Sequence, residues 1–266
     1  MNGLLETLIF GLPFFVGHLE HTTGTALSDT SKSASTVKEG PWKLMYKRDK
    51  DARDWVMKSA RLLLPYVKEN DTILDVGCFT WEARKYFPRQ LNYIGIDQVQ
   101  YHAKTKVVDL NHGFQPIQCT HALCLETLEH LLDPNDTLES IYNGLEAEGR
   151  LVVSLPNEAT VFHRLRALLG TVDAECFSGE GKHLHLPNLR QCKRLLSGKF
   201  DVERVSYYIS PSACGSRNAF LGKILSLIPD SIHQLLADRF PSLFARGFIF
   251  LLKKKPVLAE TPAPEV

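Results

Sequence analysis

The sequence has 266 residues and a formal net charge of +1, and its hydrophobic and charged fractions, 44% and 23%, are ordinary for a globular protein. This length allows one α/β domain with extensions, and the composition excludes wholesale disorder and a membrane channel. The near-neutral charge gives no general electrostatic reason to bind nucleic acid, although a local basic patch would not show in the total.

The cysteines are scattered, without a CxxC pair or the spacing of a zinc finger. They are Cys78, Cys119, Cys124, Cys176, Cys192 and Cys214. We expect buried or free thiols in a reducing compartment, which indicates a cytoplasmic protein.

The apolar residues 4–16 do not have the features of a targeting signal. No Lys or Arg precedes them, Glu6 lies among them, and they are fewer than the roughly 20 residues that span a bilayer. We expect a small leader, with contact to a membrane surface as an open alternative. Residues 22–40 are rich in Ser, Thr and Gly and indicate a flexible linker. The predicted organisation is a leader and linker (1–40), one folded domain (41–255) and a disordered tail (256–266).

The first part of the folded domain predicts a helix, followed by a strand, loop, helix and strand. Residues 51–67 carry apolar side chains at helical spacing, with Pro65 in the last turn. Two apolar strands, 73–77 and 93–97, flank a loop and a helical pattern that ends at Phe87. In such a unit the strands are parallel, and the loop after the first lies at the carboxyl edge, where these sheets bind ligands.

Gly77 and Asp97 make this edge a candidate nucleoside site. A glycine after the first strand permits positive φ and lets the backbone approach a ligand with no Cβ between them. Asp97 ends the second strand 20 residues after Gly77, so its carboxylate can reach the hydroxyls of a ribose held by the first loop.

The rest of the domain continues to alternate strands with helices or long crossovers. Asp133 and Pro134 mark a helix start, with Asp as the cap and Pro at the first helical position, and Gly149 turns the chain into the next strand. The predicted strands are 106–109, 121–125, 151–155, 201–209 and 246–254, and the predicted helices are 133–146, 159–169, 188–196 and one or two within 217–240, broken at Pro229. This order predicts an α/β fold with a mostly parallel, doubly wound sheet. The last strand follows a helical excursion (217–243) and can therefore enter the sheet antiparallel.

Six segments at the strand ends, taken in order, carry a family resemblance. They are ILDVGC (73–78), YIGID (93–97), KVVDLN (106–111), LCLETLEHLLDP (123–134), GRLVVSLPN (149–157) and FPSLFARGFIFLLKKKP (240–256). Their order and spacing resemble class I S-adenosylmethionine-dependent methyltransferases, in particular ubiquinone-pathway O-methyltransferases and methyltransferases of types 11 and 12. The resemblance covers about residues 50–255 and implies a Rossmann-like sheet of seven strands, with an antiparallel last strand and helices on both faces.

The resemblance also implies a site for S-adenosylmethionine. Asp75 would orient the first loop and the methionine amine, Gly77 would give backbone access, and Asp97 would hold the ribose hydroxyls. The other implied cofactor residues are Cys78 and Phe79 in the loop, Asp109 and Leu110 where adenine is read, and Leu125 beside the methionine moiety.

The first loop departs from the family pattern, which has an acidic residue followed by three alternating glycines. Here Phe79 and Trp81 stand where the second and third glycines would be. If Phe79 takes a left-handed turn conformation its ring must point away from the ligand; otherwise the ring fills part of the cofactor volume. The alternative to an enzyme is therefore a methyltransferase-like binding or scaffold protein whose aromatic side chains cover the sheet edge.

Glu126, Glu129 and His130 form a second candidate cluster. Their spacing of three and four residues would point all three to the same space on one helical turn, and this set suits a divalent ion such as Mg²⁺ or Mn²⁺. The run resembles the E-x-x-E-H segment of ubiquinone-pathway O-methyltransferases and small-RNA 2′-O-methyltransferases, which bind a divalent metal through it. In the RNA enzymes a later histidine joins, for which His183 is the candidate here and His185 the second choice. The open alternative is structural, with acids favouring a helix start and the histidine bonding to backbone.

The resulting hypothesis is methyl transfer from S-adenosylmethionine to an oxygen of a small molecule or of a saccharide- or lipid-linked acceptor. A hydroxyl acceptor needs a base, and the candidate catalytic residues are His130, His183 and Glu126. Membrane-surface contact could involve 4–16 or 217–243. A nicotinamide-dependent oxidoreductase is disfavoured because the sequence has no G-x-G-x-x-G.

Overall fold

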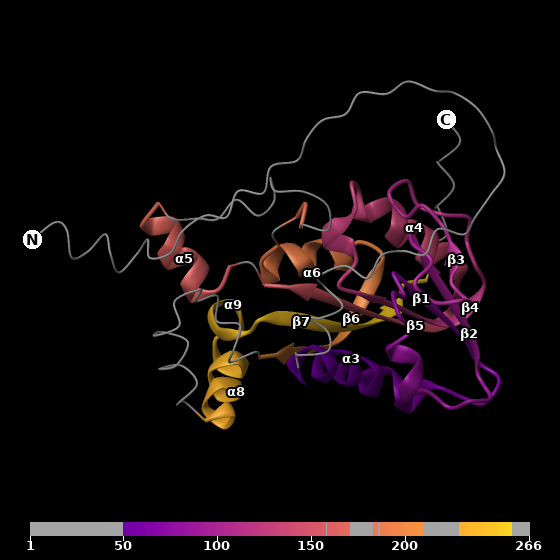
Figure 1. The fold of residues 1–266 in the computed structure, drawn as a ribbon, viewed down its shortest axis with the longest axis horizontal. Helices are drawn as coiled ribbons and strands as arrows, with labels where there is room; N and C mark the ends of the chain where they lie inside the picture. Colours follow the sequence, from indigo (N-terminus) through magenta and orange to yellow (C-terminus); the bar gives the residue numbers. More distant parts are fainter. Residues whose placement is uncertain (1–49, 158, 171–182, 186, 210–228, 257–266) are drawn as a thin grey trace, which may run out of the picture. The chain divides into compact units, whose positions relative to one another are not determined.

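The computed structural model describes residues 50–157, 159–170, 183–185, 187–209 and 229–256 (Figure 1). The predicted leader and linker (1–40), the predicted tail from 257 onward and residues 217–228, which were predicted to be helical, lie outside these ranges. None of the described helices is long and apolar enough to cross a membrane.

Seven strands of the described residues form one sheet. They are β1 (Thr72–Val76), β2 (Asn92–Asp97), β3 (Lys106–Val107), β4 (Cys119–Leu125), β5 (Leu145–Pro156), β6 (Phe200–Tyr208) and β7 (Gly247–Lys254). Their order is β3-β2-β1-β4-β5-β7-β6. Strands β1 to β5 pair in parallel, and β7 is antiparallel to both β5 and β6. The predicted sheet and its antiparallel last strand are confirmed.

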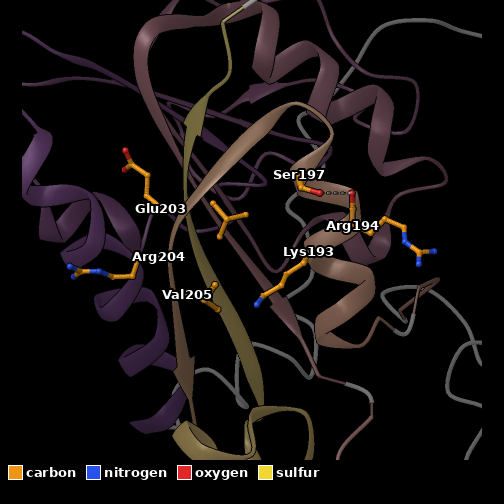
Figure 2. A pocket seen from close by; sticks show the side chains of 7 residues that line it. Lys193, Arg194, Ser197, Glu203, Arg204 and Val205 are labelled. Atoms are coloured by element: carbon orange, nitrogen blue, oxygen red, sulfur yellow. Dashed lines mark hydrogen bonds between the residues drawn. The ribbon is translucent and has the colours of Figure 1, made fainter.

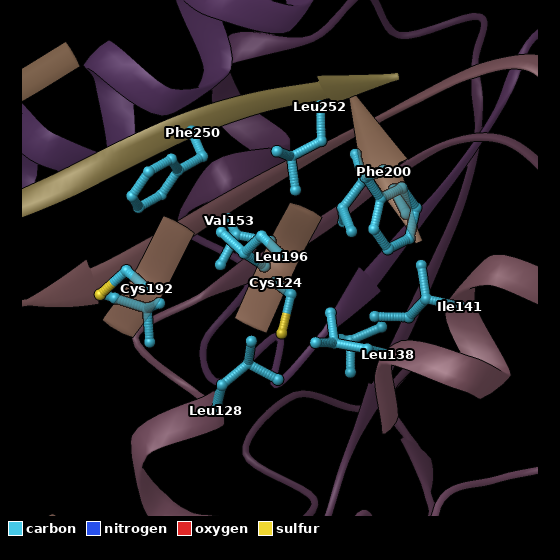
Figure 3. Close-up of a cluster of buried hydrophobic side chains, with 14 of the residues drawn as sticks. Cys124, Leu128, Leu138, Ile141, Val153, Cys192, Leu196, Phe200, Phe250 and Leu252 are labelled. Atoms are coloured by element: carbon cyan, nitrogen blue, oxygen red, sulfur yellow. The ribbon is translucent and has the colours of Figure 1, made fainter. Parts of the chain in front are cut away.

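Helices cover both faces of the sheet (Figure 1). The α-helices of the described residues are α3 (Lys50–Leu63), α4 (Pro134–Gly144), α5 (Val161–Leu168), α6 (Leu189–Ser197), α8 (Asp230–Arg239) and α9 (Pro241–Phe244), of which α3 lies on one face of the sheet and α4 and α6 lie on the other. Helix α3 buries Val56, Ala60 and Leu63 against one face. Helices α4 and α6 bury apolar side chains against the other face, where Leu138, Ile141, Cys192 and Leu196 gather around the strands (Figure 3). Burial of these apolar side chains is the main favourable contribution to folding.

Local capping signals start two of these helices at the predicted positions. The Asp133 carboxylate accepts a hydrogen bond of 2.8 Å from the Asn135 backbone N–H at the start of α4. At the start of α6, Asn188 and Gln191 form a reciprocal capping box. Gly170 follows α5 at φ 67°, as expected for a glycine that ends a helix.

Several predicted elements are shorter or differently shaped in the structure. The helix expected to end at Phe87 is only a 3₁₀ helix (Ala83–Tyr86), because Arg84 donates to the carbonyls of Phe87 and Pro88, and Pro88 cannot continue a helix. The first helix gives way to a 3₁₀ turn (Leu64–Tyr66) at Pro65. Strand β3 has two residues rather than four.

Strand β5 begins at Leu145, before the predicted turn at Gly149. Its pairing with β4 jumps from Cys119↔Leu145 to His121↔Arg150, so the extra residues bulge out of the ladder. The predicted turn therefore appears as a bulge within one long strand.

The described cysteines, Cys78, Cys119, Cys124 and Cys192, are buried free thiols, as expected. Burial raises the pKa of the Cys119 thiol to about 12, so it stays protonated and unreactive at neutral pH. Cys176 and Cys214 lie outside the described residues.

Candidate functional site

Backbone strain is concentrated at the carboxyl edge of the parallel strands. Among the described non-glycine residues, those with positive φ are Phe79 (42°), Trp81 (62°) and Glu126 (49°). Phe79 and Trp81 follow β1, and Glu126 follows β4. A left-handed conformation costs an L-residue roughly 1–2 kcal/mol, and such residues gather at binding and catalytic sites. The edge that the sequence predicts as the ligand site is therefore also where the fold retains strain.

Gly77 is required at the start of the first loop for two reasons. Its φ is 74°, and a Cβ added there would lie 2.1 Å from the Thr127 hydroxyl oxygen. The backbone N–H groups of Gly77 and Cys78 both donate to the Ile96 carbonyl, at 2.9 and 3.1 Å. The loop is thus held close to the end of β2, where a nucleoside is expected.

The aromatic rings of the first loop are packed against the loop that follows β2. Phe79 does take the left-handed conformation, and its ring centroid lies 4.7 Å from that of Tyr101. Trp81 stacks on His102 at 4.5 Å, and its indole N–H donates to the Thr105 hydroxyl at 3.0 Å. The loop therefore has the backbone conformation that glycines normally permit, with aromatic side chains that pack on the loop after β2 and, for Trp81, also on Tyr93 of β2.

Asp97 accepts hydrogen bonds from two backbone N–H groups and keeps the capacity to bind a ligand. Its Oδ2 accepts the Phe79 N–H at 2.9 Å, and its Oδ1 accepts the Val99 N–H at 3.1 Å. The side chain is half-buried, and each carboxylate oxygen can accept a second hydrogen bond. Two ribose hydroxyls can therefore still be bound by this carboxylate.

Asp75 is buried within β1 and does not lie at the exposed carboxyl edge of the sheet. Its side chain is 3% exposed and accepts a 2.6 Å hydrogen bond from the Tyr93 hydroxyl. Burial raises the pKa of Asp75 to about 7; the Tyr93 hydrogen bond opposes this effect, and the nearby Asp97 charge adds to it. Asp75 therefore changes charge near neutral pH.

The remaining predicted cofactor residues divide by exposure. Asp109 is exposed, and its Oδ1 accepts hydrogen bonds from the Asn111 backbone and side chain, which lower the pKa of Asp109. The side chains of Cys78, Leu110 and Leu125 are buried, so contact with a ligand there would come chiefly from backbone atoms.

The prediction that Glu126 shares one helical turn with Glu129 and His130 is wrong. The helical segment is a 3₁₀ helix of only Leu128–His130, and Glu126 at φ 49° lies outside it. Glu126 Oε1 instead accepts a 2.9 Å hydrogen bond from the Tyr208 hydroxyl. Burial raises the pKa of Glu126, and the Tyr208 hydrogen bond and the nearby His183 and Arg246 oppose that rise.

Glu129, His130 and His183 come together, each with one donor atom within 4.8 Å of the others. The imidazole rings of His130 and His183 lie 4.9 Å apart. Glu129 is buried, and the two histidines are half-buried. Of the four predicted metal ligands, this cluster contains Glu129, His130 and His183, and it does not contain Glu126.

Backbone hydrogen bonds hold the segment that contains His183 next to Glu129, and this places His183 in the cluster. The N–H groups of Leu184 and His185 donate to the Glu129 carbonyl at 2.7 and 3.1 Å. The His185 ring bonds to the Leu131 carbonyl at 2.9 Å, so His185 is a structural residue of this segment.

Sequence reasoning missed the aromatic partners of the site, Tyr101, His102 and Tyr208. Tyr208 lies 82 residues after Glu126, and its ring crosses Gly247, where any Cβ would collide with it. The only available signal was the position of Tyr208 at the end of a predicted strand, which places it at the same edge as Glu126.

A cavity of about 430 Å³ lies elsewhere, between α6 and the edge strand β6 (Figure 2). Its lining residues are Lys193, Arg194, Ser197, Val202, Glu203, Arg204 and Val205. None of the predicted site residues is among them, so the cavity is separate from the candidate site.

The strand order and the antiparallel β7 define the Rossmann-like fold of class I S-adenosylmethionine-dependent methyltransferases. A family model described as a methyltransferase domain matches residues 46–201, more than half of the chain. The chain therefore belongs to this family and is an S-adenosylmethionine-dependent methyltransferase.

Solved structures agree on the fold. A SAM-dependent methyltransferase from Archaeoglobus fulgidus is 16% identical with a TM-score of 0.53, and the alignment covers 81% of this chain and 100% of that chain. A chain of the complex between the Haloferax volcanii Trm112 methyltransferase activator and the putative methyltransferase is 15% identical with a TM-score of 0.52, covering 82% and 97%.

The N-methyltransferase NodS from Bradyrhizobium japonicum WM9, solved with S-adenosyl-L-homocysteine, is 11% identical with a TM-score of 0.50, covering 83% and 94%. At these identities the similarity shows the fold alone. No curated protein matches the sequence.

Proposed function

We propose that this methyltransferase transfers its methyl group to an oxygen atom of a small molecule or of a saccharide- or lipid-linked acceptor. The observation that carries the proposal is the pairing of His130 and His183 at 4.9 Å, close to the carboxyl edge. A hydroxyl must lose its proton to become a good nucleophile, and a neutral imidazole can accept that proton near pH 7. A free amine needs no such base, so two adjacent imidazoles favour an oxygen acceptor.

The first loop and the ends of β2 and β3 would hold the cofactor. S-adenosylmethionine supplies an electrophilic methyl group on its sulfonium. Asp97 would bind the ribose hydroxyls through its remaining acceptor capacity, and Asp109 would face adenine with the oxygen that Asn111 does not occupy. Gly77 would contribute its backbone, since its missing Cβ leaves room for the Thr127 side chain and its positive φ shapes the loop, and Asp75 would lie beneath the site, bonded to Tyr93.

Four of the predicted cofactor residues have side chains that are already packed within the protein. Cys78, Phe79, Leu110 and Leu125 would contribute mainly backbone atoms, since their side chains are buried or packed on other side chains.

As an alternative role for the same residues, we propose that Glu129, His130 and His183 hold a divalent metal, in which case the metal rather than a free imidazole would activate the acceptor hydroxyl. Two imidazoles and one carboxylate within 4.8 Å form a donor set that suits Mn²⁺ better than Mg²⁺, because Mg²⁺ prefers oxygen ligands. Such a metal orients an acceptor hydroxyl and lowers its pKa when bound. Glu126, which hydrogen-bonds to Tyr208, would then lie beside the metal set and contact the acceptor instead.

Calorimetric titration of the protein with S-adenosylmethionine and S-adenosylhomocysteine tests the cofactor part. We expect saturable binding of both ligands, and a loss of at least tenfold in affinity for Asp97→Ala because two hydroxyl contacts disappear. Glu148→Ala, an exposed carboxylate on β5, serves as the control and should bind like the wild type. No heat at millimolar ligand would contradict the proposal and favour the scaffold protein.

Titration with Mn²⁺, followed by electron paramagnetic resonance, tests the metal part. We expect a bound fraction that both Glu129→Gln and His183→Ala abolish, while His112→Ala, an exposed histidine outside the cluster, retains it. Equal Mn²⁺ binding by all four proteins would remove the metal from the proposal and leave the two histidines as candidate bases.

A further inference from the structure

Two aromatic pairs connect the loop after β1 to the loop after β2. Phe79 lies against Tyr101 with ring centroids 4.7 Å apart and planes at 57°, and Trp81 stacks on His102 at 4.5 Å and 27°. We call these four residues the aromatic bridge. Its two members on the first loop stand at the positions where the family pattern has glycine.

The bridge accounts for the unusual backbone of the first loop. Phe79 and Trp81 both have positive φ, which an L-residue adopts only when the surrounding structure holds it. The two ring contacts and the 3.0 Å bond from the Trp81 indole N–H to the Thr105 hydroxyl provide that support. Side-chain packing thus replaces the conformational freedom of glycine.

The loops that the bridge connects both bond to the carboxylate of Asp97 through backbone N–H groups. The Phe79 N–H donates to Asp97 Oδ2 at 2.9 Å, so the first loop is bonded to the acid that ends β2. On the other side, the Val99 N–H donates to Asp97 Oδ1, and the Tyr101 N–H donates to the Val99 carbonyl at 3.0 Å. Both backbone donors that orient Asp97 therefore lie on loops that the bridge holds together.

Strand β2 leaves room for the bridge because Gly95 has no side chain. A Cβ added at Gly95 would lie 2.7 Å from the Trp81 indole nitrogen and 2.8 Å from the Cys78 sulfur. Any larger residue at position 95 would push the indole off β2. Phe79 and Tyr101 are only half-buried, so this part of the bridge is not sealed in the core.

We propose that the aromatic bridge is a positioning device for the cofactor's nucleoside, and that it replaces the missing glycines rather than closing the site. It holds the first loop and Asp97 in the conformation that receives the ribose. This inference rests on the proposed function, because it assumes that the ribose is bound at Asp97.

The test restores the family's glycines and measures affinity for S-adenosylhomocysteine by calorimetry. Phe79→Gly and Trp81→Gly relieve the positive-φ strain, yet we expect each to bind at least tenfold more weakly, because the loop and Asp97 lose their shared support. Tyr101→Ala and Gly95→Ala disturb the bridge from its other side and should weaken binding in the same way. Phe244→Ala, an aromatic residue of α9 outside the bridge, should bind like the wild type.

Thermal unfolding of each variant shows that it is folded before its affinity is compared. If the wild type binds and the folded glycine variants bind as tightly or more tightly, the rings obstruct the site and the inference is wrong. If Gly95→Ala and Tyr101→Ala also bind normally, the bridge has no positioning role. Absence of binding by the wild type itself would overturn the proposed function, which is a separate result.

Discussion

The buried carboxyl of Asp75 should make the stability of this protein depend on pH in a predictable direction. Its pKa is raised from an ordinary value of 3.8 to about 7, chiefly by burial. The folded state therefore favours the protonated form more than the unfolded chain does. The stabilisation from this group is fully present below pH 3.8 and is lost as the pH rises through 7.

The size of the effect follows from the two pKa values. A difference of one pKa corresponds to about 1.4 kcal/mol, so the change from 3.8 to about 7 amounts to about 4 kcal/mol of unfolding free energy. In Asp75→Asn the group no longer titrates, so this pH dependence disappears. Placing an amide next to Tyr93 adds a cost that does not depend on pH. It would shift the curve of unfolding free energy against pH up or down without changing its slope.

Urea unfolding of the wild type and of Asp75→Asn between pH 4 and pH 8 measures this difference. We expect the variant to gain about 4 kcal/mol relative to the wild type across that range. Tyr93→Phe provides an independent check, because the Tyr93 hydrogen bond lowers the pKa of Asp75 and its loss should extend the transition above pH 7. Parallel curves for the wild type and Asp75→Asn would refute the reasoning.

Three further substitutions test other parts of the structure. Tyr208→Phe removes the 2.9 Å hydrogen bond to the Glu126 carboxylate and should lower the unfolding free energy by about 2 kcal/mol; an unchanged urea midpoint would argue against that bond. Gly77→Ala combines positive φ with a collision at Thr127, so it should cost at least about 2 kcal/mol and abolish S-adenosylhomocysteine binding; a stable, binding variant would contradict the geometry. Asn188→Ala removes a helix cap and should cost about 1 kcal/mol while leaving calorimetric affinity intact, and a loss of affinity would be unexpected.

Local sequence signals correctly located the starts of helices that are set by a capping side chain. Asp133 and Pro134 start α4 as predicted, because capping needs only a side chain and the next few N–H groups. The failed helix before Phe87 shows the limit of this approach. Its apolar spacing was compatible with a helix, but Pro88 and the contacts of Arg84 confine it to one 3₁₀ turn.

Local sequence signals could not predict where the side chains of the candidate functional site point. Glu126 lies outside the expected helical turn because its φ is positive, and its carboxylate is bonded to Tyr208, 82 residues later. His183 joins Glu129 and His130 because backbone N–H groups of its segment bond to the Glu129 carbonyl. Sequence spacing does not show contacts that form between distant segments.

The sequence by itself determined the fold, its methyltransferase resemblance and the edge at which Gly77 and Asp97 lie, because strand periodicity and the residues at strand ends are local properties. Only the tertiary structure decided how the degenerate loop is arranged. The conformations of Phe79 and Trp81 depend on Tyr101 and His102 from the neighbouring loop and on the space above Gly95. These contacts exist only after β1 and β2 have paired, which is why the loop's pattern alone left two opposite interpretations open.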